Sequence, residues 1–304
     1  MDAAETAQQD GSVTPAELPR PRSTPIAVRT GLGTLLVLLI ALMLAVDSTW
    51  EAGFVYCGVL LAMVALGLHE FAYLARRLGL GTDLRALVIG GVALSLVQWA
   101  GMATGAYDPW LWSGVLLSAL VMGVFGVRIV RGEIGESLQS VGSYVLGWTY
   151  VPVMLGFLTA VRLRWGVAGL IAVVGVCKAG SSGAYFAGSL LGRRKLVPRV
   201  SPGKTVAGAV GAVVAAVAVS WGLSISPLGV MRPGAAVVFG LLAALTGIFG
   251  DLAESLLKRQ ADIKDSGSLL PGFGGMLDML DDVLFTAPLG FVFLSVYESL
   301  ALGG

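Results

Sequence analysis

The segment from residue 251 to residue 282 carries the residues most able to do chemistry. It reads DLAESLLKRQADIKDSGSLLPGFGGMLDMLDD and lies between apolar stretches long enough to cross a bilayer. Charge close to hydrocarbon is costly, so charged residues kept at a membrane boundary generally serve a function. Carboxylates beside lysines and arginines indicate chemistry with metal ions and phosphate groups.

Two carboxylates near the end of this segment, Asp278 and Asp281, are three residues apart. They are expected to project from one side of the first turns of the last helix. Two carboxylates so placed repel unless a cation holds them together. A few hard oxygen ligands that leave positions open for a substrate phosphate suit Mg²⁺. The alternative is that these acids only cap the helix N-terminus, where negative charge is favoured.

The helix before the loop adds a third carboxylate. Asp251 follows a long apolar run and shares a helix face with Glu254, Ser255 and Lys258. Asp251 is therefore predicted as a further metal ligand. Glu254 and Lys258 have a simpler alternative, which is a surface ion pair four residues apart.

Two loops have compositions suited to anions. Residues 271–275, PGFGG, supply the glycines that bring backbone amides close to a ligand, although this signal alone is weak. Residues 192–205, GRRKLVPRVSPGKT, end like a P-loop. A P-loop needs glycine five positions before Gly203, where Pro198 stands, and a preceding strand. The segment is instead predicted to be a basic loop in which Ser201, Lys204 and Thr205 contact phosphate.

Two polar positions lie within predicted spans. Lys178 and the serines after it lie at membrane depth, which indicates a polar cavity, with snorkelling of Lys178 as the alternative. His69, the only histidine, ends another span next to Glu70 and is interpreted as structural.

Composition identifies an integral membrane protein. Of 304 residues, 56% are hydrophobic and 13% charged, against about 25% charged in soluble domains. A net charge of +1 argues against nucleic-acid binding through a basic surface. The two cysteines, Cys57 and Cys177, lie in apolar runs and indicate neither a disulfide framework nor a zinc site.

The predicted fold is all-α and polytopic, with about nine transmembrane helices. Residues 1–25 are polar, proline-rich and predicted to be a disordered cytoplasmic tail. Residues 26–135 are predicted to hold the N-terminal transmembrane helices, and residues 136–304 the catalytic transmembrane region. The apolar runs that reach about 20 residues are 28–46, 53–75, 84–105, 110–130, 141–161, 166–190, 205–225, 234–257 and 280–301.

The distribution of basic residues predicts the orientation. With a cytoplasmic N-terminus and nine spans, sixteen of the twenty lysines and arginines fall on the cytoplasmic side and three on the other. The positive-inside rule therefore places the C-terminus outside. A multi-pass protein of the inner or plasma membrane is expected, with both motif-rich loops facing cytoplasmic nucleotides.

Together these motifs resemble the phosphatidate cytidylyltransferase (CDP-diacylglycerol synthase) family, firmly over residues 140–300. The family signature is matched in register by Ser255, Lys258, Arg259, Lys264, Asp265, Leu270, Pro271, Gly272, Gly274, Gly275, Asp278 and Asp281. Upstream elements of the family match Ala184, Tyr185, Gly192, Arg193, Lys195, Leu196, Pro198 and the segment from Ser201 to Thr205.

Three positions depart from the family pattern. Phe273 stands where the family has histidine, and Met279 where it has arginine. Ser181 stands where an acid commonly precedes the Ala-Tyr element. The departures leave open whether activity is lowered or redirected.

The resemblance implies an enzyme that makes CDP-diacylglycerol and pyrophosphate from CTP and phosphatidate in phospholipid biosynthesis. It implies a metal centre at Asp251, Asp278 and Asp281 that holds Mg²⁺, alone or with a second cation, and it implies a homodimer. The substrate-binding residues it implies are Tyr185, Arg193, Ser201, Lys204, Thr205, Ser255, Lys258, Arg259, Lys264, Asp265, Gly274 and Gly275. The alternatives are a CTP-dependent lipid alcohol kinase and a transporter with Lys178 as its ion or substrate site.

Overall fold

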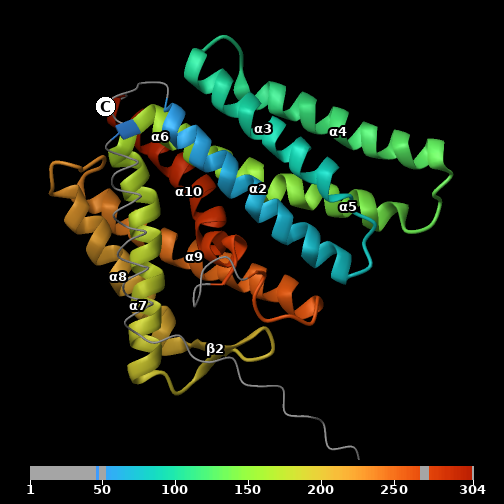
Figure 1. Cartoon of the computed structure of the whole chain (residues 1–304). Coiled ribbons are helices and arrows are strands. Elements are labelled where there is room, and N and C mark those ends of the chain that lie inside the picture. The colour runs from blue at the N-terminus through green and yellow to red at the C-terminus, as the bar shows by residue number, and fades with distance from the viewer. Residues whose placement is uncertain (1–45, 48–52, 268–273, 303–304) are drawn as a thin grey trace, which may run out of the picture.

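The computed structural model describes residues 46–47, 53–267 and 274–302, which are almost wholly helical (Figure 1). The α-helices are α2 (Phe54–Arg77), α3 (Leu84–Thr104), α4 (Pro109–Arg131), α5 (Ser137–Trp148), α6 (Met154–Leu170), α7 (Val176–Leu191), α8 (Val206–Ser224), α9 (Pro233–Gln260) and α10 (Met276–Leu302). Two π-helical turns, η1 (Thr149–Val153) and η2 (Ile171–Gly175), continue α5 into α6 and α6 into α7. The predicted all-α membrane class is confirmed.

Seven helices in the described ranges are long and apolar enough to cross a membrane. One of them, Ser137–Leu191, has 55 residues and is broken at Gly166, whose φ of 65° and ψ of −159° lie outside the helical region. Glycine alone adopts such a backbone readily. The break separates the predicted runs 141–161 and 166–190. The run 28–46 lies outside the described residues except for its last position, so the total of nine stays a prediction.

Polar side chains cap the N-termini of several helices. Asp83 precedes α3 and accepts a hydrogen bond from the Ala86 amide at 2.8 Å. Asp108 does the same for α4, accepting from the Trp110 amide at 2.8 Å. These caps satisfy amides that have no partner within a helix. They explain why the predicted runs at 84 and 110 begin where they do.

Helices α7 and α8 pack backbone against backbone through glycine. A Cβ on Gly183 would lie 2.5 Å from the Gly211 carbonyl oxygen, and one on Gly211 would lie 2.6 Å from the Gly183 oxygen. Small residues at these positions let the two helix backbones approach closely. The contact leaves the neighbouring residues of α7 and α8 to form one wall of a pocket.

The basic segment 192–205 contains a hairpin that the sequence does not predict. Strand β1 (Lys195–Val197) pairs antiparallel with β2 (Ser201–Thr205), and Lys195 lies opposite Thr205. Three residues give too short a period-two pattern to indicate a strand. The hairpin lies at the lower end of α7 in Figure 1, and Arg259 of α9 donates to the Val200 carbonyl at 3.3 Å.

Candidate active site

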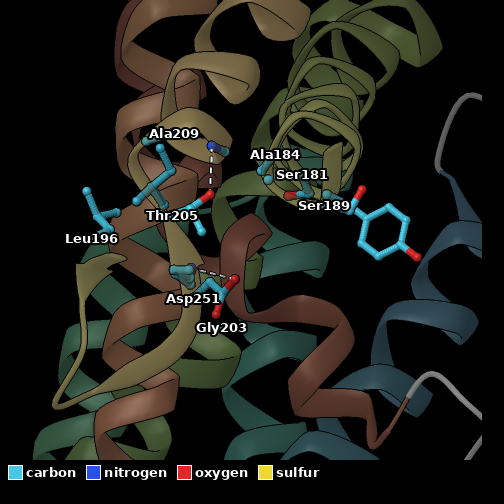
Figure 2. Close-up of a pocket in the computed structure, with 13 residues that line it drawn as sticks. Ser181, Ala184, Ser189, Leu196, Gly203, Thr205, Ala209 and Asp251 are labelled. Atoms are coloured by element: carbon cyan, nitrogen blue, oxygen red, sulfur yellow. Dashed lines mark hydrogen bonds and ion pairs between the residues drawn. The ribbon is translucent and has the colours of Figure 1, made fainter. Parts of the chain in front are cut away.

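A pocket of about 370 Å³ lies where α7, α8, α9 and the hairpin meet (Figure 2). Small and apolar residues make most of its wall, and Lys204 and Asp251 bring charge to it. Its lining residues are Ser181, Ala184, Tyr185, Gly188, Ser189, Leu196, Gly203, Lys204, Thr205, Gly208, Ala209, Ile248 and Asp251. The volume is in the range of small-molecule sites, and the mixed lining suits a ligand with a charged head and an apolar part.

Lys204 and Asp251 form an ion pair that joins the hairpin to α9. The Lys204 ammonium lies 2.6 Å from the Asp251 carboxylate, and the Ser255 hydroxyl donates to the same carboxylate at 3.4 Å. The Asp251 side chain is 43% exposed, so its charge is open to the pocket. Thr205 holds the end of β2 by capping α8, accepting from the Gly208 amide at 3.1 Å (Figure 2).

Both carboxylate oxygens of Asp278 have partners within the protein. Its Oδ2 accepts hydrogen bonds from the Ser266 amide at 2.9 Å, the Ser266 hydroxyl at 2.9 Å and the Gly275 amide at 2.8 Å. Its Oδ1 is ion-paired with Lys258. This is the capping alternative, extended to include the loop before the helix.

Glu254 and Lys258 form the predicted i,i+4 pair, but inside the protein instead of on its surface. Lys258 lies 2.5 Å from Glu254, whose side chain is fully buried, and it also contacts Asp278. One buried ammonium therefore balances two carboxylates from different helices. Its two ion-pair partners hold Lys258 within the protein, away from the open pocket.

Asp281 has few partners. It is buried, and its Oδ1 accepts only from the amide of the next residue, at 2.7 Å. The charges of Asp251 and Asp282 are close enough to act on it. Among the residues described, Asp281 has no ion pair. A buried carboxylate with acidic neighbours and no paired cation is suited to binding one.

Asp282 and Lys178 form a second link between helices. The Lys178 ammonium, on α7, lies 2.6 Å from Asp282 Oδ1 and donates to the Met279 carbonyl at 2.7 Å. The Ser181 hydroxyl donates to Asp282 Oδ2 at 2.5 Å. The Lys178 ammonium therefore has polar partners and its charge is neutralised by α10, while the polar cavity around it stays a prediction.

Glu70, on α2, is a functional-site residue that the sequence does not predict. It is buried and accepts from the amides of Met276 and Leu277 at 2.8 and 2.7 Å. Those amides open α10 and lack helical partners. Glu70 and Asp278 together therefore fix the start of the helix that carries Asp281. The feature of the sequence that could have identified Glu70 is its position as a carboxylate inside a long apolar run.

The remaining predicted residues differ in exposure. Tyr185 lines the pocket but is 68% exposed, and Ser201 is partly buried in β2. Arg193, Lys264 and Asp265 are exposed at the same end of the protein. Gly274 has a φ of 85° and, with Gly275, lies against carboxylates: a Cβ on Gly274 would be 2.6 Å from Asp278, and one on Gly275 2.4 Å from Glu70. Phe273 lies outside the described residues.

The predicted metal triad is not assembled as a group. Across residues 46–47, 53–267 and 274–302, no cluster of three or more His, Cys, Asp or Glu side chains is placed to hold a metal ion. Asp251 lines the pocket and Asp281 is buried without an ion pair in the described residues, whereas both oxygens of Asp278 are bonded to protein donors.

Comparison with known proteins agrees with the motifs. A model described as "Cytidylyltransferase family" matches residues 27–297. A phosphatidate cytidylyltransferase from Brucella suis is 35% identical over 210 residues, which are 66% of this chain and 74% of the relative. One from Chlamydia pneumoniae is 27% identical over 289 residues, 88% of this chain and 89% of the relative. An uncharacterized Escherichia coli protein, YnbB, is 29% identical over 227 residues, 66% of this chain and 75% of the relative.

Proposed function

Since the chain belongs to the cytidylyltransferase family, we propose that it makes CDP-diacylglycerol and pyrophosphate from CTP and phosphatidate. The observation that carries this proposal is the pocket at the end of α7, where a lysine and a carboxylate meet an apolar wall. A lipid phosphate and a water-soluble triphosphate must meet at such a boundary. Both are anionic, so the site needs positive charge to offset their repulsion.

The reaction forms one bond and breaks one. An oxygen of the phosphatidate phosphate attacks the α-phosphorus of CTP, and the bond to the bridging oxygen of the β-phosphate breaks, releasing pyrophosphate. The attacking phosphate is already ionised, so no general base is required. Lys204 lines the pocket and is placed to bind phosphate oxygens, with Arg193, Arg259 and Lys264 at the same end.

The described residues fit a magnesium ion in part. Asp251 is half exposed to the pocket, and Asp281 is buried without an ion pair in the described structure, so we propose these two as the ligands. Both oxygens of Asp278 already accept from Lys258, Ser266 and Gly275, so we assign it to positioning the loop and α10. Bound Mg²⁺ would stabilise the charge that develops on the phosphates.

The two alternatives have less support. A lipid alcohol kinase would transfer the terminal phosphate of CTP, and the family match favours transfer of CMP. A transporter would need Lys178 free for an ion or substrate, but its ammonium is already bound by Asp282 and the Met279 carbonyl.

The test of the proposed function is an incubation of the detergent-purified protein with phosphatidate, a lipid alcohol such as diacylglycerol, Mg²⁺ and CTP labelled in either the α- or the γ-phosphate. Label from the α-phosphate should enter the lipid, and label from the γ-phosphate should appear in pyrophosphate. Entry of γ-label into lipid would identify a kinase, and entry of neither would contradict the proposal.

We further propose a cytoplasmic N-terminus and an outer C-terminus in the bacterial inner or plasma membrane; the homodimer stays a prediction. The orientation is supported by the basic residues of segment 192–205, which the positive-inside rule places in the cytoplasm.

Cysteine labelling of intact cells is expected to confirm this orientation. Cys57 and Cys177 are buried and should give little background. A Ser201→Cys protein should react with an impermeant maleimide only after the cells are opened, because the hairpin faces the cytoplasm. An Ala106→Cys protein, altered in the exposed α3–α4 turn, should react in intact cells. The reverse pattern would invert the topology.

A further inference from the structure

Two buried polar atoms outside the pocket have no hydrogen-bond partner in the described residues. They are the hydroxyl oxygen of Tyr150 and Oε1 of Glu254. Tyr150 is 4% exposed and Glu254 is fully buried, so neither atom is open to lipid or bulk water. One is a hydrogen-bond donor and the other an acceptor. A buried polar group without a partner is costly, so each is expected to have one in the native protein.

A chain of contacts connects Tyr150 to the face of α9 that carries Glu254. The Tyr150 ring packs edge-on against Phe285 of α10, with the ring centroids 6.1 Å apart. Phe285 in turn lies against Gly250 of α9, where an added Cβ would be 2.9 Å from its ring. Glu254 follows Gly250 by four residues and shares its helix face. Tyr150 therefore lies at the seam between α9 and α10.

The same seam carries Asp281. It precedes Phe285 by four residues on α10, and its carbonyl oxygen also lies against Gly250. The charges of Glu254 and Asp281 both act on Tyr150, and the charge of Asp281 acts on Glu254. The three side chains are therefore close enough to share one small ligand. In the described residues the Asp281 carboxyl group accepts only from the amide of the next residue.

We propose that Tyr150, Glu254 and Asp281 hold one water molecule between them. The Tyr150 hydroxyl donates to the water oxygen, and the two water hydrogens go to Glu254 Oε1 and to the Asp281 carboxyl group. A buried water generally makes about three hydrogen bonds to polar groups that otherwise lack partners. This arrangement supplies three and gives each of the two unpartnered atoms a partner.

The water makes Tyr150 a positioning residue. This role rests on the proposed function, because Asp281 is a proposed Mg²⁺ ligand. Hydrogen bonds to a metal ligand from the surrounding protein fix its orientation. Tyr150 lies in the π-helical turn η1, and such turns are rare and often occur at functional sites. Tyr150 acts through the two carboxyl groups and contacts no reacting atom.

The first experiment is a cycle of Tyr150→Phe and Glu254→Met, measured as melting temperature in detergent. Each substitution removes one partner of the water, so the second one introduced should cost less than the first. Tyr150→Phe should melt about 2–4 °C below the parent, and by less than about 1 °C in the Glu254→Met background. Equal shifts in the two backgrounds would overturn the shared water.

Tyr56→Phe is the matched control for this cycle. Tyr56 is buried on α2, and its hydroxyl lies near Thr159 and Arg162. The substitution removes the same atom at a distant site, so its effect on the melting temperature should be equal in the parent and in Glu254→Met. Coupling as large as that of Tyr150 would show a general loosening of the protein and would overturn the inference from the cycle.

Activity tests the positioning role separately. Tyr150→Phe should lower the kcat of CMP transfer about tenfold and leave the KM for CTP within about twofold. Tyr56→Phe should leave both close to those of the parent. An unchanged kcat would overturn the positioning role, as would a rise in KM alone. If the parent transfers no CMP, the proposed function fails, and the melting cycle still decides whether the water is shared.

A cryo-electron microscopy map of the parent in a lipid nanodisc, at a resolution that shows bound water, tests the site directly. It does not depend on the folding of any variant. Density for one water within hydrogen-bond distance of the Tyr150 hydroxyl, Glu254 Oε1 and the Asp281 carboxyl group is expected. A direct hydrogen bond between Tyr150 and Glu254, or a map without density at this place, would overturn the proposal.

Discussion

Replacement of Asp281 by Asn is expected to slow CMP transfer by at least about 100-fold, or ~2.7 kcal/mol of barrier, with little loss of stability. The substitution keeps the volume of the side chain and removes a carboxyl group that is buried next to Asp282. In the described residues that carboxyl group has no ion pair, so its replacement costs the resting protein little. It would, however, remove a proposed Mg²⁺ ligand. CMP transfer and detergent melting temperature, measured on the same preparation, check both halves of the expectation.

Asp278→Asn is the matched comparison, three residues earlier on the same helix. It should lower activity and melting temperature together, because Asp278 binds Lys258 and fixes Ser266 and Gly275. If the Asp281→Asn protein retains more than a tenth of the parent activity, Asp281 is not a ligand of the proposed Mg²⁺. Equal melting temperatures for Asp278→Asn and the parent would contradict the proposal that Asp278 positions the loop and α10.

The helices were predictable from the sequence because apolar runs of membrane length leave few alternatives. Runs such as 84–105 and 110–130 match α3 (Leu84–Thr104) and α4 (Pro109–Arg131) within one residue at either end. Asp83 and Asp108 mark their starts by ordinary capping. The break at Gly166 also falls between two predicted runs, since a turn there needs a backbone that glycine provides.

The site was predictable as a set of residues but not as a set of contacts. Asp278 and Asp281 are the same residue type three positions apart on one helix. In the described residues Asp278 has several protein donors and an ion pair with Lys258, whereas Asp281 accepts only from the next amide. The difference depends on Ser266 and on the loop before α10, which no local pattern describes. The ion pair of Lys204 with Asp251 likewise depends on how the hairpin folds over α9.

Residues from distant segments were the hardest to foresee. Glu70 reaches α10 from more than 200 positions away, and its effect comes from tertiary packing. Asp282 was overlooked beside Asp281 because nothing in the sequence indicates that it faces Ser181 and Lys178.

Replacement of Lys258 by Met is the second substitution for which we expect a large effect. It should lower the stability of the folded protein. Lys258 is buried between Glu254 and Asp278, so its loss leaves two carboxylates without their counter-charge. Removing one partner of a buried pair costs about 3–5 kcal/mol. Oε1 of Glu254 already lacks a hydrogen-bond partner in the described structure, so this carboxylate cannot easily be satisfied otherwise. Melting temperature and yield of folded protein should both fall.

A second substitution separates lost charge balance from lost packing. Glu254→Gln combined with Lys258→Met removes one stranded carboxylate at nearly constant volume, so it should melt above Lys258→Met alone. Packing loss alone would predict that the double variant melts no higher than the single. If Lys258→Met instead keeps its melting temperature and only raises the KM for CTP, Lys258 binds substrate in the active protein, and the buried pair is not its functional state.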